Sequence, residues 1–297
     1  MIDTHLVHRL IASQFPAWAH LPIRPVAVQG WDNRTFRLGD NMLVRMPSAT
    51  QYAKQVEKEH MWLPQLANFL PLPIPTPVTI GEPDMEYPFK WSIYRWLPGE
   101  TAATATIKDK NQFAIDLAKF IIALQSINTD GGPIPQPHQF AHVAGLNYYD
   151  QQFRQAIELL KHEIDPVLAL QLWEKALQRR WTSPPVWVHG NISTGNLLLN
   201  NGKLCAVIDF GCMGVGDPAC DIVIAWKFFQ ATERAIFCEL LPLDVDTWHR
   251  GRAWALWKAA IIKAGVITSN PIETSQATHT IHEVLTDYAK NHLFPIF

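Results

Sequence analysis

The sequence predicts an α+β fold with two lobes, an antiparallel sheet in the first lobe and mainly helices in the second. A chain of 297 residues fits two modest lobes, because a single hydrophobic core stops growing at roughly 250 to 300 residues. Short strand-like segments separated by turn residues fill the first part of the chain, and helical patterns fill most of the rest. We therefore expect one lobe over residues 1–98, a hinge at about residues 92–99, and a second lobe over residues 99–297.

The first lobe is expected to combine two helices with five strands. Residues 3–15 show an amphipathic helix pattern with Asp3 as a suitable N-cap, and a second helix is expected over residues 51–67. The proline-rich residues 70–77 should run extended, because proline fixes its own backbone and restricts the residue before it. The strands are expected at residues 25–29, 35–38, 42–46, 78–80 and 89–96.

The second lobe is expected to be helical apart from one compact β-element. Helices are predicted over residues 108–126 and 148–180, on either side of a glycine- and proline-rich loop at residues 130–145. Further helices follow the β-element and run towards the C-terminus.

The composition indicates a globular protein with a small ligand. The net charge is −2 and the Lys and Arg residues are scattered, which argues against a nucleic-acid partner. The N-terminus carries no signal-peptide pattern, and no apolar run reaches the roughly 18 residues needed to span a bilayer. We expect a cytoplasmic monomer or homodimer without a membrane partner. The four cysteines lack C-x-x-C spacing, so free thiols are expected rather than a zinc site.

The β-element of the second lobe is predicted to be a hairpin that brings two oxygen ligands together. Asn201-Gly202 is a strong two-residue turn signal between apolar runs. Asn196 and Asp209 then emerge at the open end of the hairpin, and an amide oxygen with a carboxylate suits Mg²⁺ bound together with phosphate oxygens. The expected cross-strand pairs are Leu199 with Leu204, Leu197 with Ala206, and Asn196 with Val207.

The residues around this hairpin carry a resemblance to a known family. His189-Gly190-Asn191, then Asn196, then Ile208-Asp209-Phe210-Gly211 resemble the catalytic and metal-binding motifs of the aminoglycoside phosphotransferase family, which is related to the protein kinases. The similarity extends over residues 20–265. It implies a protein-kinase-like fold with ATP or GTP and Mg²⁺ as cofactors, and with His189 and Asp221 as supports of the catalytic loop.

The same resemblance implies a set of nucleotide-binding residues. Arg45 on a strand would hold the nucleotide phosphates and pair with Glu59 on the following helix. In the hinge, the Arg95 carbonyl and the Leu97 amide would contact the adenine edge. The turn that contains Asn33 corresponds to the phosphate loop, whose backbone amides could cap the phosphates.

Asn191 departs from the family pattern, because an aspartate is expected at this position. An aspartate would accept the proton of the acceptor hydroxyl, whereas the amide of Asn191 can orient the hydroxyl but cannot take its proton at neutral pH. Three interpretations remain open: an engineered Asp-to-Asn substitution in an active kinase, a naturally slow kinase, and a nucleotide-binding pseudokinase.

The resemblance also implies a small hydroxylated molecule as the acceptor. An aminoglycoside-like antibiotic comes first, with a macrolide or a metabolite such as choline or homoserine as alternatives. Since the first lobe is committed to the nucleotide, the acceptor site is expected in the second lobe, at residues 130–145 and in the helices after Asp221.

Overall fold

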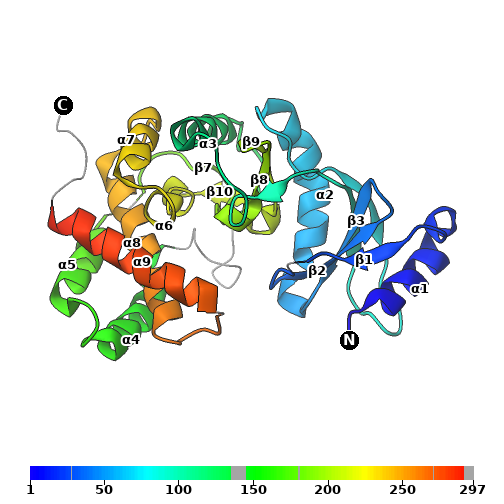
Figure 1. Cartoon of the computed structure of the whole chain (residues 1–297), viewed down its shortest axis with the longest axis horizontal. Helices are drawn as coiled ribbons and strands as arrows, with labels where there is room; N and C mark the ends of the chain where they lie inside the picture. The colour runs from blue at the N-terminus through cyan, green and yellow to red at the C-terminus, as the bar shows by residue number, and fades with distance from the viewer. Residues whose placement is uncertain (28, 135–144, 180, 270, 291–297) are drawn as a thin grey trace.

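The computed structural model has two lobes side by side (Figure 1). It describes residues 1–27, 29–134, 145–179, 181–269 and 271–290. One lobe contains a five-stranded antiparallel sheet with two helices, and the other contains seven helices and two small sheets in the described residues. This arrangement confirms the predicted two-lobed α+β fold.

The sheet of the first lobe places Arg45 on a strand with neighbours on both sides. Its strand order is β1-β2-β3-β5-β4, and Arg45 of β3 lies opposite Thr35 of β2 and Ser92 of β5. The strands are β1 (Ile23–Pro25), β2 (Asn33–Leu38), β3 (Met42–Pro47), β4 (Pro77–Gly81) and β5 (Trp91–Arg95).

The first strand lies earlier in the chain than predicted. Residues 25–29 were expected to form it, but β1 pairs with β2 from Ile23, which lies opposite Leu38. β1 ends at Pro25, which has no N–H to donate to the sheet, although the N–H of Val26 still donates to the Thr35 carbonyl of β2 at 3.2 Å. Residue 28 lies outside the described residues.

Two helices pack on this sheet. Helix α1 (Thr4–Gln14) begins at the predicted N-cap, where Asp3 accepts a hydrogen bond of 3.0 Å from the N–H of Leu6. Its buried face joins strand residues such as Phe36 and Trp91 in the core of this lobe. Helix α2 (Lys54–Leu66) lies between the sheet and the second lobe, and short 3₁₀ turns at both of its ends complete the helix predicted over residues 51–67.

In the second lobe the helix expected over residues 148–180 is two helices, α4 (Asp150–Leu160) and α5 (Pro166–Leu177). Asp165 caps α5 by accepting from the N–H of Leu168 at 3.0 Å, and Pro166 occupies the first helical position. A proline lacks the N–H that a continuing helix needs and clashes with the preceding turn, so a proline inside a helix kinks or breaks it. Here Pro166 starts a new helix, with Asp165 as its cap. The other helices are α3 (Lys110–Gln125), α6 (Ile224–Lys227), α7 (Ala231–Leu240), α8 (Val245–Lys263) and α9 (Pro271–Ala289).

The predicted hairpin is present, with one change of register. Leu199 faces Leu204 as expected, but Leu198 faces Ala206, so Cys205 is an extra residue that forms a β-bulge. The predicted pairs of Leu197 with Ala206 and of Asn196 with Val207 are therefore wrong, and Leu197 faces Val207 instead. The strands of the two small sheets are β6 (Glu100–Thr101), β7 (Val186–Val188), β8 (Leu197–Asn200), β9 (Lys203–Val207) and β10 (Gly214–Gly216).

All four cysteines are free; Cys220 is buried and the other three are half-buried. Within the described ranges, no helix combines the length and the apolar character that crossing a membrane requires.

Candidate active site

Three charged residues from distant parts of the chain form a continuous ion-pair chain. One guanidinium nitrogen of Arg45 donates to both carboxylate oxygens of Glu59, at 3.0 and 3.2 Å, and another donates to Asp209 at 2.5 Å. Glu59 comes from α2 and is only 2% exposed. Burial by itself would lower the pKa of Arg45, but the carboxylates of Glu59 and Asp209 outweigh it and hold the pKa above its ordinary value. Arg45 is therefore a permanent cation at the junction of β3, α2 and the segment that follows β9.

Asp209 has an unusual backbone conformation. Its φ of 68° and ψ of 62° lie in the left-handed region, which aspartate tolerates better than most residues. The side chain is 36% exposed, so the carboxylate is accessible to a ligand despite its contact with Arg45. The short turn that follows, Phe210–Cys212, carries the chain away from the site.

Asn196 lies beside the Asp209 segment because of the bulge in the hairpin. The N–H of Ile208 donates to the Asn196 carbonyl at 2.9 Å, where the predicted register had Val207 as the neighbour. The side-chain nitrogen of Asn196 donates to the backbone carbonyl of Asn191 at 2.9 Å, which leaves the amide oxygen as the atom that can bind a cation. An amide oxygen and a carboxylate are ligand types that Mg²⁺ accepts together with phosphate oxygens and water, so these two residues fit the predicted ion.

The loop that contains Asn191 is held from beneath by a buried carboxylate. Asp221 accepts hydrogen bonds of 2.7 Å from the N–H groups of His189 and Gly190. Burial raises the pKa of Asp221 to about 6, against the opposing effect of these two hydrogen bonds. Gly190 has a φ of 81°, and a Cβ atom there would lie 2.5 Å from the Cys212 carbonyl oxygen. The loop therefore requires glycine at this position.

The ring of His189 links the Asn191 loop to the Asp209 segment. Its Nδ1 accepts from the N–H of Asn191 at 3.2 Å, so its Nε2 carries the proton and donates to the Ile208 carbonyl at 3.0 Å. The residue is fully buried, and burial lowers its pKa to about 4. A neutral histidine with both nitrogens occupied is a structural link rather than a proton carrier.

The turn before β2 is tied to α2 through Gln55. The Asn33 side chain is buried and donates to the Gln55 amide oxygen at 3.4 Å, while the Gln55 amide nitrogen donates to Asp32 at 2.9 Å. Burial raises the pKa of Asp32, and the nearby Asp209 carboxylate acts in the same direction. The side chain of Asn33 is thus engaged by α2, and the backbone amides of this turn are the groups expected to approach the phosphates.

The end of β5 forms the connection towards the second lobe. The N–H of Arg95 donates to the Thr76 carbonyl at 2.9 Å, and the N–H of Trp96 donates to the Asn41 carbonyl at 2.8 Å. Among the described residues, the N–H of Leu97 has no hydrogen-bond partner. This donor is therefore available where a nucleotide base was expected to bind.

Sequence reasoning missed three residues that complete the site: Gln55, Lys58 and Tyr94. Gln55 and Lys58 lie on α2 close to Glu59, and Gln55 precedes it by four residues on the same helix face. The four-residue spacing between Gln55 and Glu59 was the sequence signal that could have identified Gln55. The Tyr94 hydroxyl donates to Glu59, and burial raises the pKa of this tyrosine well above its ordinary value. No spacing rule would have paired Tyr94 with Glu59, because the contact depends on how α2 lies on the sheet.

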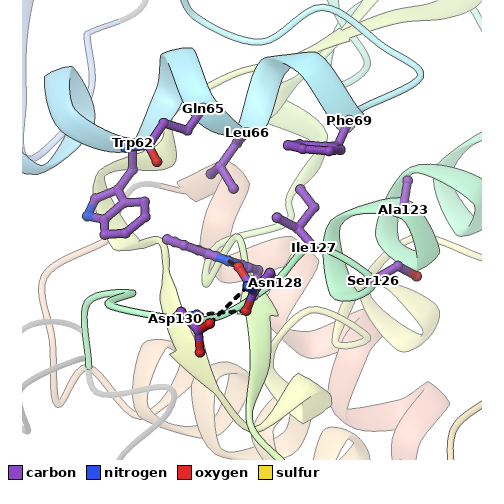
Figure 2. Close-up of a pocket in the computed structure, with 10 residues that line it drawn as sticks. Trp62, Gln65, Leu66, Phe69, Ala123, Ser126, Ile127, Asn128 and Asp130 are labelled. Carbon is purple, nitrogen blue, oxygen red and sulfur yellow. Dashed lines mark hydrogen bonds between the residues drawn. The ribbon is translucent and has the colours of Figure 1, made fainter.

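A separate cavity of about 440 Å³ lies between α2, α3 and the chain that follows α3. Figure 2 shows Trp62 and Leu66 on one side and Asn128 and Asp130 on the other. None of the predicted site residues lines it. The acceptor loop predicted at residues 130–145 adjoins this region at Asp130, but residues 135–144 lie outside the described part of the chain.

The chain is similar to known proteins over most of its length. The model of the phosphotransferase enzyme family matches residues 23–254. The chain is 28% identical over 193 residues to an aminoglycoside 3'-phosphotransferase of Salmonella typhimurium, covering 62% of this chain and 69% of the relative. A relative of the same name from Escherichia coli shows the same identity and coverage.

Solved structures share the fold. The GDP complex of aminoglycoside 2'-phosphotransferase-IIIa superposes with a TM-score of 0.71 at 17% identity, covering 98% of this chain and 100% of that protein. Macrolide 2'-phosphotransferase type I superposes with a TM-score of 0.61 at 19% identity, covering 94% and 96%. Since the family model spans most of the chain, including both lobes and the residues from Arg45 to Asp221, the chain belongs to the phosphotransferase enzyme family.

Proposed function

We propose that this protein transfers the terminal phosphoryl group of ATP or GTP to a hydroxyl group of a small molecule. The observation that carries the proposal is the joining of Arg45, Glu59 and Asp209 into one ion-pair chain beside the Asn191–Asn196 loop. In this proposal residues 1–98 bind the nucleotide, and residues 99–297 supply the catalytic loop and the acceptor site.

The nucleotide would lie between the lobes. The Leu97 N–H and the Arg95 carbonyl would bind the edge of the base, and the backbone before β2, next to Asn33, would approach the phosphates. Arg45 would balance phosphate charge while Glu59 keeps its guanidinium in place. The guanidinium is already held by its ion pairs with Glu59 and Asp209, so little reorganisation is needed when the nucleotide binds.

Asn196 and Asp209 would hold the Mg²⁺ ion. When bound, this ion supplies neutralisation of the charge on the phosphate oxygens. The hydrogen bond from Asn196 to the Asn191 carbonyl orients the amide oxygen, and the contact with Arg45 orients the Asp209 carboxylate. His189 and Asp221 would keep the two segments in register without touching the substrates.

Asn191 would orient the acceptor hydroxyl through its side-chain oxygen. Phosphoryl transfer passes through a loose transition state that depends mainly on positioning and charge stabilisation, so transfer without a base is slowed rather than abolished. We propose a kinase of reduced rate. A pseudokinase is the second candidate, and the specific observation in its favour is the amide at position 191.

The acceptor proposed first is an aminoglycoside, because the curated relatives are aminoglycoside 3'-phosphotransferases. A macrolide is the alternative, supported by the fold shared with macrolide 2'-phosphotransferases. Small hydroxylated metabolites are the remaining candidate acceptors.

A mass-spectrometric screen tests the proposal. The protein and its Asn191→Asp variant are incubated with ATP or GTP, MgCl₂ and a panel of aminoglycosides, macrolides, choline and homoserine. The expected result is the gain of one phosphoryl group by members of one acceptor class, faster with the variant and absent with Asp209→Ala. If the protein shows no Mg²⁺-dependent binding of ATP or GTP in calorimetry, the proposed function is wrong. Binding without transfer by either form would instead identify a pseudokinase.

A further inference from the structure

Helix α2 directs several side chains towards the site from one face. Gln55, Lys58 and Glu59 follow the spacing of positions i, i+3 and i+4, which places them along one stripe of the helix. Trp62, at position i+7, lines the separate cavity. Gln55 reaches the turn before β2 and Glu59 pairs with Arg45. Lys58 takes part in neither contact.

Lys58 bonds to the backbone that follows Asp209. Its Nζ donates to the carbonyl oxygens of Gly211 and Met213, each at 2.8 Å. These two carbonyls lie on either side of Cys212, in the turn through which the chain leaves the site. The ammonium group is partly buried, and burial lowers its pKa. Lysine is seldom withdrawn from water unless its head group gains partners, and here the partners are backbone carbonyls.

The turn needs such support because Asp209 has left-handed backbone angles. An L-residue in this region is less stable than in the β or right-handed regions, so contacts on both sides must hold it. Before Asp209, the chain is fixed by the pairing of β8 with β9 and by the bond from Ile208 to Asn196. After Asp209, Lys58 supplies two hydrogen bonds in which the donor is charged, the stronger class of such bonds.

We propose that Lys58 is a positioning residue for the metal-binding segment: it clamps the Gly211–Met213 turn and thereby sets the conformation in which Asp209 meets the Mg²⁺–nucleotide complex. This inference rests on the proposed function. Lys58 would touch neither the ion nor the nucleotide, and it acts through the backbone of the turn. The same helix thus orients Arg45 through Glu59 and Asp209 through Lys58.

The test compares Lys58→Met with Lys54→Met. Lys54 lies on the same helix one turn earlier and is exposed, so it controls for the loss of a lysine from α2. In calorimetry, Lys58→Met should weaken ATP binding about tenfold in the presence of MgCl₂. ATP binding in EDTA should stay as in the wild type. Lys54→Met should change neither affinity. Equal affinities of Lys58→Met and wild type in MgCl₂, or equal losses in MgCl₂ and EDTA, would overturn the proposal.

A second readout needs no ligand. Hydrogen exchange of the ligand-free protein should be faster in Lys58→Met for the peptide over residues 208–214, where the Met213 N–H donates to the Phe210 carbonyl at 2.9 Å. Exchange in β7 should not change. If the wild type binds no Mg²⁺–ATP, the proposed function fails, and this exchange experiment still decides whether Lys58 holds the turn. If Lys58→Met does not fold, Lys58→Gln keeps an N–H donor group but loses the charge and is shorter. It should show the same two effects at smaller size, and wild-type behaviour of Lys58→Gln in both would overturn the proposal.

Discussion

The side-chain amide of Asn196 donates to the backbone carbonyl of Asn191 at 2.9 Å. One side chain therefore joins the segment that would face the acceptor hydroxyl to the segment that would hold the metal ion. His189 makes a second link between these segments through the Asn191 N–H and the Ile208 carbonyl. Because of these two links, a substitution that displaces one segment should also displace the other. A substitution that keeps the shape of the side chain should change only the chemistry at its own position.

Asn191→Asp changes chemistry with little change in shape. The two side chains are nearly isosteric, and the carboxylate can accept the hydroxyl proton, so turnover of an acceptor that binds should rise by roughly 10² to 10⁴. Affinity for the nucleotide should change little. Single-turnover phosphorylation measures the first quantity and calorimetry the second. Asn191→Ala is the control, because it removes the side-chain oxygen and should not raise the rate. If Asn191→Asp is as slow as wild type, residue 191 is not the position of the general base.

Asp209→Ala should remove the dependence of nucleotide binding on Mg²⁺. The remaining amide oxygen of Asn196 carries no charge and cannot by itself hold the ion against the phosphates. Calorimetry with ATP in MgCl₂ and in EDTA measures this dependence. Asp40→Ala is the control, because Asp40 is an exposed aspartate of the first lobe and is not among the residues proposed to hold the ion. Retention of full Mg²⁺ dependence by Asp209→Ala would exclude Asp209 as the principal ligand.

The free energy of unfolding should fall in acid because His189 is buried in its neutral form. Burial lowers its pKa from 6.5 to about 4, so between these pH values the unfolded chain binds a proton that the folded protein does not. Its contribution to stability is present above pH 6.5 and is lost as the pH falls to about 4. The loss should reach about 3 kcal/mol.

Urea unfolding across this pH range measures the effect as a difference between proteins. His189→Gln should show a shallower fall in the free energy of unfolding than wild type, whereas His8→Gln, at an exposed position of α1, should match wild type. The difference is the useful quantity because burial also lowers the pKa of His249 to about 4. Parallel curves for wild type and His189→Gln would disprove the assignment.

Gly190→Ala should destabilise the protein more than Gly265→Ala. Both glycines have positive φ, 81° and 67°, so alanine costs about 1 to 2 kcal/mol at either position. At Gly190 the new Cβ would also lie 2.5 Å from the Cys212 carbonyl oxygen, whereas at Gly265 no atom lies within 4 Å. Thermal and denaturant unfolding should therefore show an additional loss for Gly190→Ala only. Equal losses would mean that the loop can move away from Cys212 at little cost.

Much of the fold and many of the site positions could be predicted because they depend on neighbours in the chain. The Asn201-Gly202 turn defines the hairpin locally. The short spacings of Asn191, Asn196 and Asp209 predicted that their segments lie together, and the structure places these segments in contact. The assignment of roles to these residues remains a prediction.

The parts that could not be predicted depend on backbone atoms and on packing between distant segments. The bulge at Cys205 changes the neighbour of Asn196 from Val207 to Ile208, and no residue type in the hairpin marks it. The sequence by itself determined that a helix carries Glu59 and that a strand carries Arg45. Only the tertiary structure decided that Lys58 bonds to the carbonyls of Gly211 and Met213, because every residue has a carbonyl and its use depends on where the helix lies.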